Sequence, residues 1–170
     1  MIPSRITEYL DKNKVPFKRR PHSQAISAQE LAASLHITGF SVAKSVLVAA
    51  DGDKWIAVLP AAETVDLPRL AASLGSRSAR LLTEAEFAPI FPECEVGAEP
   101  PFGILYGLPV IVDSSLSRAS WIILRAGSHQ ESLEMAYSDF VALEKPKVGS
   151  FGALITSAES QRQREARTLR

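Results

Sequence analysis

The stretch from Val42 to Pro60 constrains the fold of this chain more than any other. Two apolar runs, residues 42–50 and 55–60, flank the dipeptide Asp51-Gly52, a pattern typical of a β-hairpin with a tight turn. Because successive residues of a strand point to opposite faces, Lys44 should share its face with three valines. These are Val42, Val46 and Val48, while Ala43, Ser45 and Leu47 should share the other face.

Lys44 is the residue in this hairpin that needs an explanation. Burying an ammonium group without a partner is costly, so a lysine on a valine face indicates a counter-charge or a ligand. A lysine that snorkels from an edge strand, or that blocks edge pairing, gives the same pattern without any function. The spacing alone leaves both interpretations open.

Composition limits the classes of protein to consider. The 170 residues fit one domain, and 19 Lys plus Arg balance 19 Asp plus Glu, so a protein that coats nucleic acid through a broad positive field is excluded. The single cysteine, Cys94, allows no intramolecular disulfide and no cysteine-cluster metal site, and we interpret it as a buried thiol. No signal peptide or membrane-spanning run is visible, so we expect a soluble, cytoplasmic protein without membrane contact.

Spacing and capping signals predict the other elements. Helices are expected over 4–14 with Ser4 as N-cap, from Ser27 to a stop at Gly39, from Asp66 to Gly75, from Thr83 to Pro92 and over 139–143. Short strands are expected over 17–20, 79–82, 109–113, 119–125 and 132–136. This order predicts an α+β fold with a mixed, mostly antiparallel sheet. Residues 1–156 should form the domain, and the arginine-rich residues 157–170 a flexible tail.

Two segments look suited to a binding site. The loop over 91–103 combines proline, which fixes φ, with glycine, which frees it, so it could hold an oxyanion or a small ligand, or simply close a structural turn. Gly127-Ser128-His129 follows a strand directly and fits either a site rim or a hydrogen-bonded turn. The basic residues 18–20 beside His22 fit a solvated edge strand or a phosphate contact. No histidine pair has a metal-ligand spacing.

Taken together, these parts resemble the YbaK family of free-standing aminoacyl-tRNA deacylases, relatives of the editing domain of bacterial prolyl-tRNA synthetase. The resemblance rests on Lys44-Ser45 in a strand, the Gly97–Gly103 loop, Asp113 and Gly127–His129, and it covers roughly residues 4–145. It implies a single compact α+β domain whose curved mixed sheet is surrounded by helices. It also implies hydrolysis of the ester bond in mischarged tRNA, without a metal, cofactor or covalent intermediate.

The resemblance also implies roles for individual residues. Lys44 matches the essential lysine of the family, and residues 97–101 match the loop that contacts the aminoacyl group. From the chemistry we expect the Gly97 and Ala98 amides to accept the oxyanion, and the adjacent ribose hydroxyl to help activate water, because no strong base is evident. The expected substrate contacts are His22, Ser45, Pro60, Pro100, Pro101, Phe102, Gly103, Asp113, Gly127, Ser128 and His129.

The expected partner is the acceptor end of a tRNA mischarged with a small amino acid such as Ala, Ser, Thr or Cys. Prolyl-tRNA synthetase or another synthetase is a further expected partner. The alternative is a non-catalytic module that binds an aminoacyl-tRNA end or a synthetase. A third interpretation is a protein-only interaction domain in which Lys44 is structural.

Overall fold

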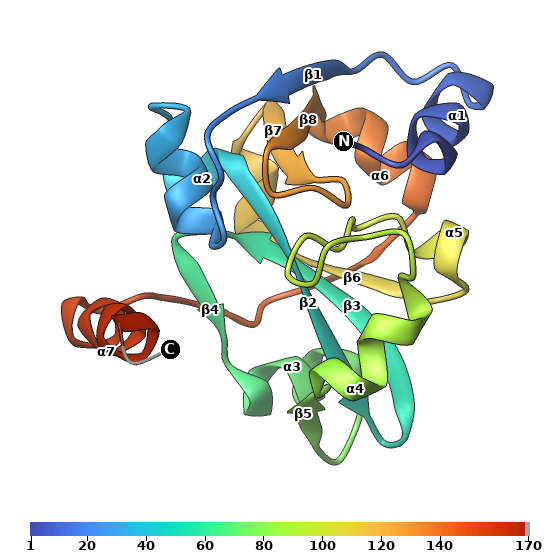
Figure 1. Ribbon diagram of the computed structural model, residues 1–170. Helices are drawn as coiled ribbons and strands as arrows, with labels where there is room; N and C mark the ends of the chain where they lie inside the picture. Colours follow the sequence, from blue (N-terminus) through green and yellow to red (C-terminus); the bar gives the residue numbers. More distant parts are fainter. Residues whose placement is uncertain (169–170) are drawn as a thin grey trace.

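The central hairpin is present as predicted. In the computed structural model, which describes residues 1–168, β2 (Val42–Ala50) and β3 (Asp53–Pro60) pair antiparallel in a register that places Ala50 opposite Asp53 (Figure 1). The two turn residues, Asp51 and Gly52, have φ angles of 48° and 87°. Positive φ at both central residues is the signature of the two-residue type I′ turn that Asp-Gly favours.

The hairpin lies inside a mixed, mostly antiparallel sheet, which confirms the predicted α+β class. The sheet order is β1-β8-β7-β2-β3-β6-β9, and β5 pairs with the C-terminal part of β2. Three neighbouring pairs, β2–β7, β3–β6 and β6–β9, are parallel. The remaining strands are β1 (Lys18–Pro21), β5 (Ala79–Leu81), β6 (Val110–Asp113), β7 (Trp121–Arg125), β8 (Glu131–Ala136) and β9 (Lys147–Gly149), with β4 (Glu63–Val65) and β10 (Gly152–Leu154) in a separate pair.

Helices lie around the sheet, and most of their capping signals are confirmed. Ser27 with Glu30 and Thr83 with Glu86 form capping boxes, and the Asp66 side chain accepts from the Arg69 amide. The α-helices are α1 (Ser4–Lys12), α2 (Ala28–Ser34), α3 (Leu67–Leu74), α4 (Glu84–Phe87), α5 (Gly103–Tyr106), α6 (Tyr137–Glu144) and α7 (Ser157–Thr168). The 3₁₀ helices are η1 (Gly39–Ser41), η2 (Ala88–Ile90) and η3 (Ser114–Arg118).

Two predicted helix boundaries were wrong. The N-cap of α1 is Pro3 and not Ser4, whose carbonyl accepts from the Thr7 hydroxyl inside the first turn. Helix α2 ends at Ser34, with Leu35 as its C-cap, and not at Gly39, because His36 takes the positive φ that terminates it. The sequence analysis also missed β4, β9, β10 and α5, which are only three or four residues long and have no readable periodicity.

The two faces of β2 pack into different parts of the core. Ala43 and Leu47 belong to the main cluster, together with residues of α1, α6 and the 91–103 loop. Val42 packs under α2, and Val48 packs in a third cluster with α3. The predicted alternation is therefore confirmed, and Lys44 lies on the face that α2 and α3 cover.

The C-terminal residues form α7, which Figure 1 shows set apart from the sheet at the end of the segment that follows β10. The boundary at residue 156 and the flexibility of the tail stay predictions, and residues 169–170 lie outside the described part. None of the helices in residues 1–168 is long and apolar enough to cross a membrane.

Candidate functional site

Lys44 is half-buried between Val42 and Val46 on β2. Burial disfavours its charged form and lowers its pKa to about 8, while the nearby Glu63 carboxylate acts in the opposite direction. In the described residues, no ion pair within 4.0 Å involves this ammonium. The protein thus holds a cation on an apolar face with only partial compensation, which argues against the snorkelling interpretation.

Glu63, which the sequence analysis did not single out, connects Lys44 to a polar network around Asp113. The Glu63 carboxylate lies 2.8 Å from the Ser115 hydroxyl, which also contacts Asp113. Asp113 Oδ1 accepts from the amides of Phe151 (2.7 Å) and Gly152 (2.8 Å). Burial opposes ionisation of Asp113, but these hydrogen bonds outweigh it and lower its pKa. Asp113, a predicted substrate contact, therefore fixes the connection between β9 and β10.

The strand pairing of β2 is interrupted beside Lys44. On that edge β7 pairs only with Val42 and Ala43, and β5 begins pairing only at Val48. Residues 44–46 therefore have no strand neighbour on this edge. Strand β7 runs parallel to β2, and the last pair between them is Ala43 with Leu124. Arg125 and the turn at Gly127 therefore follow where this pairing ends, close to Lys44 and Ser45.

The predicted loop and the predicted Gly-Ser-His turn come together at this place. The Gly127 amide donates to the Ala98 carbonyl (2.8 Å), and the Glu95 amide donates to the Gly127 carbonyl (3.0 Å). The His129 amide donates to Glu95 Oε2 (2.6 Å), and His129 Nε2 lies 2.8 Å from the Val96 carbonyl. Topology thus gathers Lys44, Ser45, the 94–99 loop and residues 127–129 at one break in the sheet.

Gly97 is required by its backbone conformation and by its neighbour. Its φ is 88°, and a β-carbon added here would lie 3.4 Å from His129 Cε1. Its amide donates to both carboxylate oxygens of Glu99, at 2.9 and 3.1 Å, and the Ala98 amide donates to the Glu95 carbonyl. Both amides expected to hold an oxyanion have acceptors within the protein, so they would have to exchange these hydrogen bonds to do so, and their role stays a prediction.

Three buried polar atoms in the described residues have no hydrogen-bond partner: Ser45 Oγ, Arg125 Nη1 and His129 Nδ1. All three belong to residues beside the break in β2 pairing. Since the Val96 carbonyl can only accept, His129 Nε2 carries the proton, and Nδ1 of the neutral ring is an acceptor. Two of these residues, Ser45 and His129, were among the predicted substrate contacts, and Arg125 was not.

His22 and Arg125 tie the segment before α2 to this region. His22 Nε2 lies 2.8 Å from the Ser132 hydroxyl, and burial lowers the pKa of His22. Arg125 Nη2 donates to the carbonyls of Ala25 and Ser27. Ser132, which the sequence analysis missed, faces Arg125 across the β7–β8 pair.

The remaining predicted contacts have packing roles in this structure. Phe102 is fully buried and meets the Tyr9 ring edge-on at 5.9 Å, and Gly103 begins α5, where the Leu108 carbonyl excludes a β-carbon. Pro60, Pro100 and Pro101 are buried. Burial raises the pKa of Cys94 to about 11, as expected for an inert thiol. Residues 1–168 contain no group of three His, Cys, Asp or Glu that could hold a metal ion.

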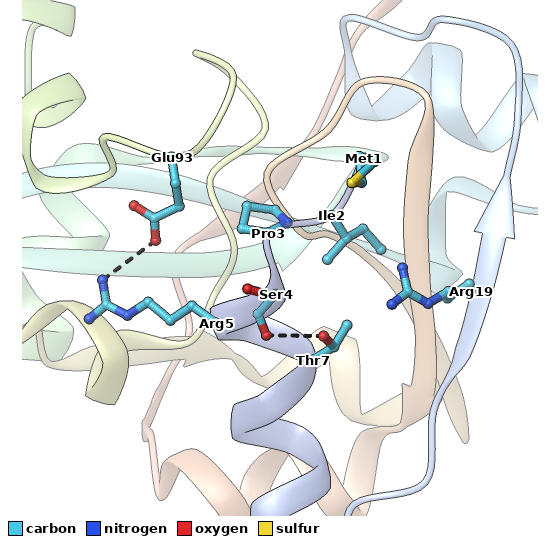
Figure 2. Close-up of a pocket in the computed structure, with 8 residues that line it drawn as sticks. All are labelled: Met1, Ile2, Pro3, Ser4, Arg5, Thr7, Arg19 and Glu93. Carbon is cyan, nitrogen blue, oxygen red and sulfur yellow. Dashed lines mark hydrogen bonds and ion pairs between the residues drawn. The ribbon is translucent and has the colours of Figure 1, made fainter.

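A hollow of about 660 Å³ is lined mainly by the N-terminal segment, whose Met1 ammonium donates to the Ser128 hydroxyl (3.3 Å) (Figure 2). Pro3 in this lining contacts Gly127 closely, as the position of a β-carbon added to Gly127 shows. Arg5 and Arg19 reach it from α1 and β1, and each has a long, solvent-exposed ion pair, with Glu93 (3.5 Å) and Glu131 (3.4 Å) respectively. Such exposed pairs contribute little stability. Arg5 also donates to the Leu105 carbonyl and lies 4.8 Å from the centre of the Tyr106 ring, so Arg19 is the freer of the two to exchange partners.

Comparisons with known proteins give a consistent result. A family model described as the aminoacyl-tRNA editing domain matches residues 22–143. The solved structure of hypothetical protein APE2540 superposes with a TM-score of 0.80 at 17% identity, covering 88% of this chain and 99% of that chain. A protein described as a candidate trans-editing enzyme for prolyl-tRNA synthetase gives 0.75 at 18% identity, covering 88% and 96%. A larger protein from Marinobacter aquaeolei VT8, described as a candidate signal transduction protein, gives 0.70 at 22% identity, covering 90% and 31%.

Proposed function

Because this chain belongs to the aminoacyl-tRNA editing domain family, we propose that it is a deacylase that hydrolyses the ester of mischarged tRNA in trans. The substrates we propose carry a small amino acid, with Ala, Ser, Thr and Cys as the candidates. A synthetase pocket rejects an amino acid that lacks one methylene by only about 1–3 kcal/mol, so such errors need a second enzyme to remove them.

Lys44 is the observation that carries this proposal. Its partly compensated ammonium lies on β2 where the pairing with β7 ends, close enough to Glu63 for an electrostatic interaction. With a pKa of about 8 it is mostly protonated at neutral pH. A preorganised cation in a region of low dielectric stabilises negative charge strongly, so we assign oxyanion stabilisation to Lys44 in place of the Gly97 and Ala98 amides.

We propose that His129, which the sequence suggested only as a substrate contact, accepts a hydrogen bond from the attacking water. Its Nδ1 is buried and has no hydrogen-bond partner. Ser45 Oγ is also unpaired, but it lies on the face of β2 opposite to Lys44. We propose that His129 Nδ1 positions the attacking water, with the ribose hydroxyl as a further contributor. Because the Val96 carbonyl and Gly97 lie against the buried His129 ring, we propose that the 94–99 loop moves when substrate binds.

The hollow in Figure 2 suits the unpaired 3′ end of the tRNA. It adjoins Ser128, and Arg5 and Arg19 could exchange their glutamate partners for phosphates. Three other arginines are less available, because Arg80 and Arg20 are paired with Glu86 and Glu134, and Arg125 is buried. A synthetase partner and a cytoplasmic location remain part of the proposal.

A panel of tRNAs charged with Ala, Ser, Thr and Cys tests the activity. We expect the wild type to release at least one of these amino acids well above the buffer rate. Lys44→Ala should abolish release, and Lys54→Ala, an exposed lysine of the same hairpin, should retain it. Tight binding of charged tRNA without any ester loss would support the non-catalytic module instead.

A further inference from the structure

Glu99 is a buried carboxylate in the loop that the proposed site uses. Glu99 is only 5% exposed, and both of its carboxylate oxygens accept a hydrogen bond from the Gly97 amide. Burial raises its pKa, and the hydrogen bond from the Gly97 amide opposes that shift. No ion pair within 4.0 Å involves Glu99 in the described residues, although His129 and Arg125 lie near enough to interact with it electrostatically. The ionised form of Glu99 is therefore compensated only in part, which is costly unless a ligand completes it.

The carboxylate also has capacity for further hydrogen bonds. An ionised carboxylate offers about four lone-pair sites, and within residues 1–168 only the backbone amides of Gly97 and Glu99 donate to it. A ligand that brings a positive charge with several donors would satisfy the remaining sites. A negatively charged ligand would be repelled.

An aminoacyl ester brings such a group close to its reacting atom. The α-ammonium nitrogen and the ester carbon are both bonded to the α-carbon, so they lie about 2.5 Å apart. The Glu99 oxygens lie 2.9 and 3.1 Å from the Gly97 nitrogen. Gly97 also lies against the His129 ring, the group to which we assign the attacking water, so an ester that reacts at His129 would have its ammonium close to Glu99.

We propose that Glu99 binds the free α-ammonium group of the aminoacyl ester and so determines which esters are accepted. This inference rests on the proposed deacylase function and deepens it. Esters whose α-nitrogen is acylated, as in peptidyl-tRNA, have no positive charge at that position and leave the Glu99 carboxylate uncompensated. The protein should then remove misplaced amino acids without hydrolysing growing peptides from tRNA.

The test compares two substrates on the same tRNA: an amino acid from the panel that the wild type releases, and its N-acetyl derivative. We expect the wild type to prefer the free amine by about 100-fold in kcat/KM, because a charge-assisted hydrogen bond is lost with the acetylated substrate. Glu99→Gln keeps a carbonyl oxygen for the Gly97 amide but loses the charge, so its preference should fall about tenfold or more. Glu84→Gln, which removes an exposed carboxylate near Glu99, should keep the wild-type preference.

The ratio of the two rates separates a specificity role from a structural one. If Glu99 only shapes the loop, Glu99→Gln will slow both substrates equally and leave the ratio unchanged, which would overturn the inference. A wild type that hydrolyses both esters at similar rates would also overturn it. A wild type that releases none of the four amino acids of the panel would refute the proposed function itself, and that result is distinct from both.

Discussion

Replacing Lys44 by methionine should make the protein more stable while removing its activity. Folding lowers the pKa of this lysine from 10.5 to about 8. At 1.36 kcal/mol per pH unit, this difference corresponds to a cost of about 3 kcal/mol for keeping the charged form in the fold. Methionine has a similar shape and no charge. Since Glu63 loses an attractive neighbour, we expect a net gain in the free energy of unfolding of about 1–3 kcal/mol at pH 7.

The gain should depend on pH in a specific direction. The folded pKa of Lys44 lies below the unfolded value, so the wild type bears the full cost below about pH 8. The cost declines as the pH rises from about 8 to 10.5, where the lysine becomes neutral in both states. The advantage of Lys44→Met should therefore be largest at neutral pH and should fade above pH 8.

Urea denaturation at pH 7, 8.5 and 10 measures this directly, alongside a deacylation assay. A gain of 1 kcal/mol should raise Tm by about 2–4 °C in a protein of this size. Lys54→Met, at an exposed site in the same hairpin, should change stability by less than about 0.5 kcal/mol at every pH. A Lys44→Met protein that is less stable than the wild type at pH 7, or whose difference is constant across the pH range, would refute our account of this lysine.

Three further predictions concern the loop, the network and the RNA contacts. Gly97→Val forces a branched side chain into a φ of 88° beside His129, so kcat/KM should fall at least tenfold with a stability loss of about 1–3 kcal/mol; a full rate on the preferred substrate would contradict this. Asp113→Ala leaves the buried Phe151 amide without its acceptor and should cost about 2–4 kcal/mol at pH 7. Because the folded pKa of Asp113 is lowered, the stability lost in Asp113→Ala should shrink only as the pH falls through and below about 4. A loss of the same size at pH 7 and pH 2.5 in urea titrations would argue against this account of Asp113. The slope of log affinity for tRNA against log salt concentration should be shallow, about −2 to −3, because a protein that binds only the acceptor end makes few phosphate contacts. Deletion of residues 157–170 should leave the rate on an acceptor-stem substrate nearly unchanged. A slope near −6 that disappears with this deletion would show that the tail anchors the RNA.

The parts of the structure that could be predicted from sequence have strong local causes. The Asp51-Gly52 turn, the capping boxes at Ser27 and Thr83, and the alternating burial around Lys44 depend on neighbouring residues alone. The strands β4, β9 and β10 could not be predicted, because three residues leave no periodicity to read. Their positions follow from contacts with distant segments, such as the Asp113 hydrogen bonds to residues 151–152.

The candidate site was predictable in the same partial way. Lys44 stood out because it lies on a valine face, Gly97 because it lies in a loop rich in proline and glycine, and His129 because it follows a strand directly. Glu63 and Glu99 did not, because nothing local distinguishes a buried glutamate from the many that are exposed. Sequence also could not show that the Glu99 side chain folds back onto the Gly97 amide.

The tight turn at the end of the central hairpin decides which face of the sheet each side chain of β2 occupies. Six residues separate Lys44 from Asp51, and every residue between them is paired with β3 in a register that starts at the turn. Removing or adding one residue in between would exchange the faces of Lys44 and Ser45, moving the ammonium into the main core and a hydroxyl onto the valine face. The chain can therefore tolerate length changes here only in steps of two, and the orientation of its lysine is decided at a loop far from the chemistry.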